Sequence, residues 1–309
     1  MRTVSLLPAA TEIVGALGLM DSLVGVSHEC DYPPEANEKP RVTHCDIHGA
    51  GLPSRQVDRW VTETLASTGT LYSMDEELLR TLCPDVILTQ RLCDVCAVGY
   101  GSVTALAHTL PGPPRVVNLE PTCLGDILED IRNVAACLGV PKRGEDVVAQ
   151  LTERVDAVRS RAALASRRPR CFLMEWIDPP YCAGHWNPEL VEIAGGEEPL
   201  GRKGEDSTRI PWDRVLEAQP EVLVLACCGY GVERTLKDLP ILEAFPDWKG
   251  LQAVREGRVY AVDGCAYFSR PGPRVVDSLE ILAELLHPEL FRSRFQDRGT
   301  RKIWRATAR

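Results

Sequence analysis

The sequence predicts an α/β fold of two lobes, each built around a parallel β-sheet. Three observations support this prediction. A chain of 309 residues is long enough for about two domains. Short apolar segments alternate with helical patterns, which is typical of parallel sheets whose strands are buried on both faces. One long amphipathic segment separates two sets of these strands. It could connect two lobes, or it could be one more crossover helix of a single sheet.

The predicted strands are short, apolar and rich in β-branched residues. Those before the long helix are Thr3 to Leu7, Leu23 to Val26, Val86 to Thr89 and Arg115 to Leu119. Those after it are Cys171 to Met174, Val222 to Ala226 and Arg258 to Val262. A helix follows the first strand, where Thr11 is a candidate N-cap and Gly18 a candidate C-cap.

The long helix is predicted from Gly144 to Ala165, because its apolar residues recur at spacings of three and four while charges fill the other face. It suggests three parts. Residues 1–141 form an N-terminal lobe, residues 142–168 a connecting helix, and residues 169–309 a C-terminal lobe with a basic tail. Between Arg292 and Arg309 that tail holds seven basic residues and one acid, so we expect a solvated end.

A weak internal echo also favours two lobes. Cys83, Pro84 and Asp85 precede one predicted strand, and Gln219, Pro220 and Glu221 precede another. A cysteine-containing loop follows each strand. Duplication would explain the echo, and so would chance.

Composition narrows the function. The formal net charge of -9 argues against non-specific binding to nucleic acid. No apolar run is long enough for a transmembrane helix, so no membrane insertion is expected. The apolar N-terminal segment is interrupted by Pro8 and Glu12 and is interpreted as part of the fold rather than as a signal peptide. A cytoplasmic location and reduced thiols are therefore predicted for this chain of twelve cysteines.

Ligands of open parallel sheets bind outside the carboxyl ends of the strands, and this rule selects the candidate ligand-binding residues. In the first lobe they are Pro8, Thr11, Glu29, Cys30, Tyr32, Arg91, Cys93, Asp94 and Cys96. In the second lobe they are Glu175, Trp176, His185, Trp186, Cys228, Asp263, Tyr267, Phe268 and Arg270.

Thiols provide the candidate metal ligands. Cys93 and Cys96 form a C-x-x-C pair, a spacing that can hold a soft metal ion or exchange disulfides. Cys228 could add a third ligand, whereas its neighbour Cys227 is poorly placed to bind the same ion. The alternative is that all of them are small, partly buried apolar residues.

Two other features have both a functional and a structural interpretation. His185 and Trp186 could contact a ligand or could anchor a buried loop. Arg270 could bind an anionic group near a helix N-terminus or form a salt bridge with Asp263. The sequence has no Walker loop, no G-x-G-x-x-G after a strand, no H-E-x-x-H and no G-x-S-x-G, which argues against the common enzyme classes.

Four segments resemble the cobalamin-binding and metal-chelate substrate-binding proteins of bacterial ABC importers. These segments are Val4 to Ile13, Val24 to Ser27, Asp31 to Pro34 and Leu82 to Ile87, within a resemblance that covers about residues 1 to 290. It implies two Rossmann-like lobes joined by one long helix, with a ligand cleft between them. It also implies a corrinoid ligand such as cobalamin, an ABC permease as partner, and ligand contacts from Tyr32, the Arg91 loop, Trp186 and the segment Asp263 to Arg270.

The chain departs from these transport proteins at its cysteine pairs and in the segment Glu175 to Pro179. Together with the unrecognised signal peptide, this indicates a cysteine-rich intracellular branch. The leading hypothesis is binding of a corrinoid or other metal chelate without catalysis. The alternatives are an intracellular metal-binding protein and a thiol-dependent enzyme assisted by Glu175, Asp178 or His185.

Overall fold

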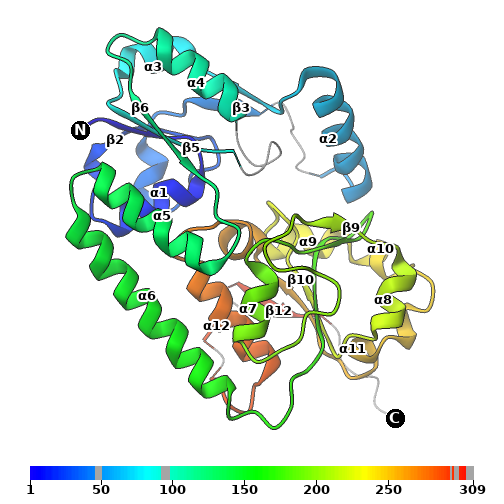
Figure 1. The fold of residues 1–309 in the computed structure, drawn as a ribbon. Coiled ribbons are helices and arrows are strands. Elements are labelled where there is room, and N and C mark those ends of the chain that lie inside the picture. Colours follow the sequence, from blue (N-terminus) through cyan, green and yellow to red (C-terminus); the bar gives the residue numbers. More distant parts are fainter. Residues whose placement is uncertain (46–50, 92–97, 293, 296–298, 304–309) are drawn as a thin grey trace. The chain divides into compact units, whose positions relative to one another are not determined.

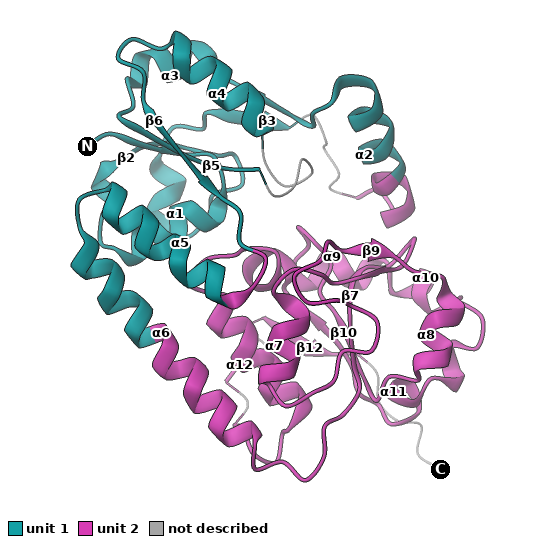
Figure 2. Ribbon diagram, in the orientation of Figure 1, with its two compact units in different colours: residues 1–50, 59–121, 125–150 teal, residues 51–58, 122–124, 151–309 magenta. Residues whose placement is uncertain are grey.

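The computed structural model describes residues 1–45, 51–91, 98–292, 294–295 and 299–303 (Figure 1). It divides into two compact units (Figure 2). Unit 1 contains residues 1–50, 59–121 and 125–150, and unit 2 contains residues 51–58, 122–124 and 151–309. Unit 2 therefore includes two short segments from the N-terminal half of the chain.

Unit 1 is built on a parallel sheet with the strand order β2-β1-β5-β6. Its strands are β1 (Thr3–Ser5), β2 (Leu23–Val26), β5 (Val86–Gln90) and β6 (Arg115–Leu119). All four were predicted, but β1 is shorter than expected because helix α1 (Pro8–Ala16) begins only three residues after Ser5. Pro8 occupies the first turn of α1, so Thr11 lies inside this helix and the prediction that it is the N-cap is wrong.

The remaining elements of the N-terminal half are helices, two 3₁₀ turns and a second small sheet. The helices are α2 (Ser54–Thr68), α3 (Glu76–Leu82), α4 (Tyr100–Thr109) and α5 (Leu124–Cys137), with 3₁₀ turns at Met20–Ser22 and Pro34–Glu38. A two-stranded antiparallel sheet, β3 (Thr43–Cys45) with β4 (Tyr72–Met74), was not predicted. Val4 and Ile87 from the parallel sheet pack with Leu79 and Val103 from the helices in one hydrophobic cluster.

Unit 2 is built on a sheet with the strand order β12-β11-β10-β7-β8-β9. The three predicted strands, β7 (Cys171–Trp176), β10 (Val222–Leu225) and β11 (Val259–Val262), form its parallel centre. Three short strands extend it through antiparallel pairing: β8 (Tyr181–Cys182) pairs with β7, β9 (Thr208–Arg209) pairs with β8, and β12 (Thr300–Lys302) pairs with β11. β12 pairs with β11, so residues 300–302 are part of the sheet, while the basic side chains of Arg301 and Lys302 are exposed as expected for a solvated tail.

Helices pack on both faces of this sheet. They are α7 (Asn187–Ile193), α8 (Trp212–Ala218), α9 (Val232–Lys237), α10 (Leu239–Glu243), α11 (Gln252–Arg255) and α12 (Val275–Leu286). A 3₁₀ turn spans Trp248–Gly250, and a π-helix spans Gly264–Phe268 directly after β11. Phe172 and Met174 of β7 pack with Leu225 and Trp248 in the main hydrophobic cluster, so this side of the sheet is buried.

The long helix is α6 (Pro141–Ala162), which starts three residues before the predicted Gly144. Its residues up to 150 belong to unit 1 and those from 151 onward to unit 2. The prediction of an α/β fold with two lobes joined by one long helix is therefore confirmed. The boundaries at 141 and 168 stay a prediction. Among the helices that the structure describes, none combines the length and apolar character needed to cross a membrane.

The internal echo is a repeated structural unit. Cys83 ends α3 and Gln219 ends α8, both with left-handed φ angles of 41° and 42°. Two residues later, Asp85 accepts a hydrogen bond from the backbone N–H that precedes β1, at 2.6 Å. Glu221 accepts one from the backbone N–H that precedes β7, at 3.0 Å. Each half thus uses a left-handed helix end and an acid to start a buried strand.

Candidate functional site

The carboxyl ends of β7, β10 and β11 bring several predicted residues of unit 2 together. Because these strands are parallel, Trp176, Cys228 and Asp263 come at the same edge of the sheet. The Cys228 N–H donates to the backbone oxygen of Glu175 at 3.0 Å. The ring of Trp176 lies 4.8 Å from that of Tyr230. This edge is therefore lined by aromatic, thiol and carboxylate side chains.

The segment after β11 is held in place by its own side chains. The Asp263 carboxylate accepts a hydrogen bond from the Ala266 N–H at 2.7 Å and so caps the π-helix. Phe268 is only 1% exposed and Arg270 only 5% exposed. The Arg270 guanidinium donates to the Cys265 sulfur at 3.3 Å. Phe268 and Arg270 therefore support this edge from within, while Tyr267 is only partly buried.

Predicted residues also meet in the loop before α7. The His185 ring stacks on the Trp186 ring, with centroids 5.7 Å apart. Trp186 is 4% exposed, which matches the interpretation of this pair as a loop anchor. Burial lowers the pKa of His185 despite the nearby charge of Asp206, so its imidazole is neutral at pH 7. Glu175 lies close to this loop, because its carboxylate accepts hydrogen bonds from the Ser207 hydroxyl and the Gly184 N–H.

A segment from the N-terminal half completes unit 2, and sequence reasoning missed it. The guanidinium of Arg55 binds both carboxylate oxygens of Asp178, at 2.9 and 2.8 Å. The guanidinium of Arg209 binds both oxygens of Asp58, at 2.8 and 3.0 Å. The Arg55–Asp178 pair is bidentate through two nitrogens, whereas a single nitrogen of Arg209 contacts both oxygens of Asp58. The segment 51–58 supplies the cation of one pair and the anion of the other.

This segment also uses a residue predicted to contact the ligand. The indole N–H of Trp176 donates to the backbone oxygen of Ser54 at 3.3 Å. The Ser54 N–H in turn donates to the buried carboxylate of Asp238 at 3.2 Å. One edge of the Trp176 ring is therefore occupied by the protein itself. No local pattern could reveal these contacts, because their partners are more than 120 residues apart.

The predicted residues of unit 1 separate into internal and exposed groups. The Thr11 hydroxyl lies 2.9 Å from the Ser5 hydroxyl and 3.1 Å from the Cys30 sulfur. Thr11 and Cys30 are fully buried, and Pro8 is buried with them. Glu29, Tyr32 and Arg91 are exposed. Among the predicted site residues of unit 1 that the structure describes, these three are the exposed ones.

The candidate metal ligands are only partly described. Cys93, Asp94 and Cys96 lie outside the described residues, so a metal site there stays a prediction. Cys228 is partly buried, and burial raises the pKa of its neighbour Cys227 to about 12. Among the described residues, no cluster of three or more histidine, cysteine or acidic side chains could hold a metal ion. No disulfide joins any two of the ten described cysteines.

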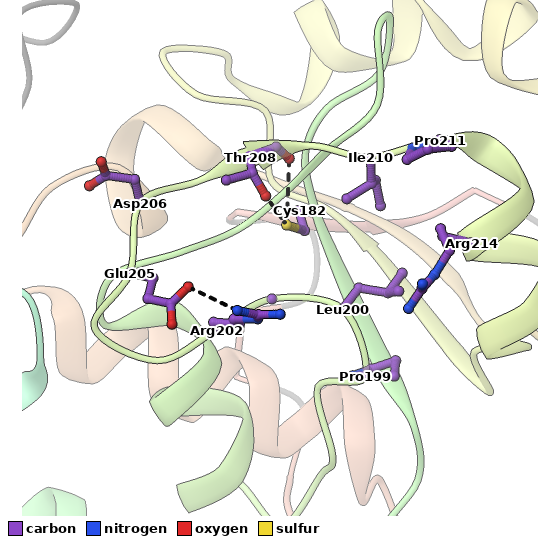
Figure 3. A pocket seen from close by; sticks show the side chains of 11 residues that line it. Cys182, Pro199, Leu200, Arg202, Glu205, Asp206, Thr208, Ile210, Pro211 and Arg214 are labelled. Carbon is purple, nitrogen blue, oxygen red and sulfur yellow. Dashed lines mark hydrogen bonds and ion pairs between the residues drawn. The ribbon is translucent and has the colours of Figure 1, made fainter.

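A pocket of about 410 Å³ lies elsewhere in unit 2, beside strand β8 and the edge strand β9 (Figure 3). The Cys182 thiol lies 3.3 Å from the Thr208 hydroxyl, and Arg202 forms an ion pair with Glu205 at 3.5 Å. The pocket is lined by Cys182, Pro199, Leu200, Gly201, Arg202, Glu205, Asp206, Thr208, Ile210, Pro211 and Arg214. None of the predicted site residues is among them.

Solved structures of known proteins share this fold. A periplasmic heme-binding protein from Pseudomonas aeruginosa matches with a TM-score of 0.72 at 20% identity, covering 94% of this chain and 93% of that one. The periplasmic vitamin B12-binding protein of Vibrio cholerae matches with a TM-score of 0.67 at 23% identity, covering 93% and 96%.

Sequence relatives agree with the structural matches. A vitamin B12-binding protein of Vibrio cholerae is 23% identical over 290 residues, which cover 90% of this chain and 86% of the relative. A vitamin B12-binding protein of Yersinia pseudotuberculosis is 26% identical over 232 residues, which cover 73% and 69%.

The prediction of a cytoplasmic location is wrong. The matched solved structures are periplasmic proteins, and this finding points to the periplasm instead. The prediction depended on the apolar segment before Met20, which forms β1 and α1. A segment that is part of the fold carries no information about location. The description of a cysteine-rich intracellular branch is set aside for the same reason.

A model of the family described as periplasmic binding protein matches residues 4–265. The match spans well over half of the chain and includes the carboxyl ends of both parallel sheets. It supports ligand binding as the general role. The chain belongs to the periplasmic binding protein family, the substrate-binding proteins of ABC importers, as its resemblance predicted.

Proposed function

We propose that this protein binds a metal-containing macrocycle, a corrinoid or a heme, and delivers it to an ABC permease. The observation that carries the proposal is the carboxyl edge of the unit 2 sheet, where the Trp176 and Tyr230 rings lie 4.8 Å apart and the π-helix capped by Asp263 carries Tyr267. Such a ligand offers a large flat ring and peripheral polar groups. Aromatic side chains would bury the flat ring, and a few polar side chains would orient the ligand through its peripheral polar groups.

The relatives support both ligands of this proposal. Those matched in sequence are vitamin B12-binding proteins, and the solved structures include heme-binding ones. A thiol-dependent enzyme has less support from the described residues. The Cys227 thiol is protonated at neutral pH, because its pKa is about 12, and a protonated thiol is a poor nucleophile.

Direct titration tests the proposal. The purified full chain is titrated with hydroxocobalamin and, separately, with hemin, and binding is followed by absorbance and by equilibrium dialysis. We expect saturable binding of one of them with a Kd in the micromolar range or tighter. Saturable binding of neither ligand at micromolar concentrations would contradict the proposal.

A pair of aromatic variants locates the site. Tyr267→Ala should weaken the affinity about tenfold, because an aromatic contact is lost. Trp212→Phe is the matched control, since Trp212 stacks on Phe245 at 4.7 Å on helix α8. Its affinity should equal that of the wild type. Equal affinity for all three proteins would place the ligand away from the π-helix.

A further inference from the structure

Glu175 lies between a strand and a loop that carries a candidate ligand contact. It is the fifth residue of β7 and is partly buried. Its carboxylate accepts hydrogen bonds from the Ser207 hydroxyl and from the Gly184 N–H. The Gly184 N–H also lies 3.0 Å from the Ser207 hydroxyl oxygen. Three segments of unit 2 therefore meet at one carboxylate.

The loop above this carboxylate has little freedom. A Cβ atom on Gly184 would lie 2.4 Å from the backbone oxygen of Glu205, so only glycine fits there. The His185 N–H donates to that same oxygen at 2.6 Å, and the Gly204 N–H donates to the His185 oxygen at 2.9 Å. His185 also has a left-handed φ of 52°, which costs free energy unless its surroundings hold it.

The loop is linked to the carboxyl edge of the sheet. Trp186 follows directly, with its indole N–H buried and without a hydrogen-bond partner among the described residues. The side-chain amide of Asn187 donates to the backbone oxygen of Phe268 at 3.3 Å. Phe268 ends the π-helix that forms part of the proposed binding edge. Movement of this loop would therefore disturb both Trp186 and the π-helix.

We propose that Glu175 is a positioning residue for ligand binding, which acts by fixing the loop of Gly184, His185 and Trp186 through Ser207. The inference depends on the proposed function for the identity of the ligand. It replaces the sequence-based hypothesis that Glu175 contacts the ligand directly. Its carboxylate oxygens are already engaged by the protein, so its effect on affinity passes through the loop.

Three variants of the full chain test the inference. Glu175→Ala removes both acceptors. Glu175→Gln keeps one oxygen for the Gly184 N–H and offers an amide N–H to the Ser207 oxygen. Glu221→Gln is the matched control, because Glu221 is another buried acid bonded to a backbone N–H, placed before the amino end of β10 instead.

Two readouts are combined: the Kd for whichever of hydroxocobalamin and hemin the wild type binds, and amide hydrogen exchange. For Glu175→Ala we expect about a tenfold higher Kd and faster exchange at residues 183–187, since a charge-assisted hydrogen bond is lost. Glu175→Gln should restore most of both properties. Glu221→Gln should leave the Kd and the exchange at 183–187 unchanged, although it unfolds more easily.

The possible failures are distinguishable. If the wild type binds neither ligand, the proposed function fails, and the exchange data alone still test whether Glu175 fixes the loop. If the wild type binds and Glu175→Ala binds equally well with unchanged exchange at 183–187, the inference is wrong. If Glu175→Ala does not fold, Ser207→Ala replaces it, because it removes the same link and should raise the Kd and the exchange in the same direction.

Discussion

Gly264 shows how one missing side chain shapes the proposed binding edge. It begins the π-helix after β11, and a Cβ atom there would lie 2.2 Å from the backbone oxygen of Cys227. Gly264→Ala should therefore lower the free energy of unfolding by about 1–3 kcal/mol, the usual cost of overpacking. Urea unfolding measures it. Gly250→Ala is the control, because its nearest atom is 3.9 Å away, and equal effects of both substitutions would contradict this account.

At this scale, the sequence predicts positions better than orientations. It placed Glu175 at the end of a strand, where the structure also has it, and Thr11 after the first strand, where the structure has it inside α1. It could not show that both point into the protein, because their partners lie elsewhere in the chain. The hydroxyl that binds Glu175 comes from Ser207, and the thiol beside Thr11 comes from Cys30. Such pairings depend on tertiary packing, which leaves no periodic signal.

At the scale of the elements, Asp85 and Glu221 each bind the backbone N–H that precedes a buried strand, and Glu221 gives a testable prediction. Glu221 is buried and accepts the backbone N–H before β7. Burial alone would raise the pKa of Glu221, but that N–H and the charges of Arg167 and Arg170 outweigh it, so its pKa is lowered. Glu221→Gln should cost about 1–3 kcal/mol of stability at pH 7. The loss should shrink as the pH falls from the unfolded-state pKa of about 4.3 through the lower pKa of the folded protein, because the unfolded wild-type chain then gains a proton before the folded one does.

A surface pair of similar chemistry is the control for this prediction. Glu217 pairs with Arg214 at 3.5 Å, and its side chain is 71% exposed. Glu217→Gln should change the free energy of unfolding by less than about 0.5 kcal/mol. Thermal and urea unfolding at pH 7 and at pH 3.5 provide the comparison. A loss for Glu221→Gln that is equally large at both pH values would rule out the ionised carboxylate as its cause.

The predictability of an element depends on its length. All seven predicted strands are present, and most of them, such as β5, β7 and β10, have several consecutive apolar residues that are buried. The strands that were missed, β3, β4, β8, β9 and β12, have only two or three residues. A segment that short cannot show a period of two, and these strands form because a neighbouring strand is already there. The contacts of residues 51–58 with the rest of unit 2 were not predicted either, because their partners lie more than 120 residues away in the sequence.

Over the whole molecule, buried acids should make stability fall as the pH rises. Burial raises the pKa of Glu198 to about 7, although three backbone N–H groups partly offset this effect. Burial also raises the pKa of Asp130 to about 7, with added repulsion from nearby acids. Each folded unit therefore holds a proton that its unfolded chain releases near pH 4. The folded state binds more protons between about pH 4 and 7, so stability is lost across that window as the pH increases.

The double variant Asp130→Asn/Glu198→Gln isolates this effect, since neither new side chain titrates. Between pH 6 and 8 the wild type should lose about 1 kcal/mol per carboxyl more than the variant, after a discount for solvent around Asp130. The pKa values of His28 and His185 are lowered by burial and act in the opposite direction, but they are common to both proteins and cancel in the difference. Unfolding is measured at both pH values. Parallel pH curves would show that the two carboxyls are ionised in the folded protein, and the packing around Glu198 and Asp130 would then have to admit water.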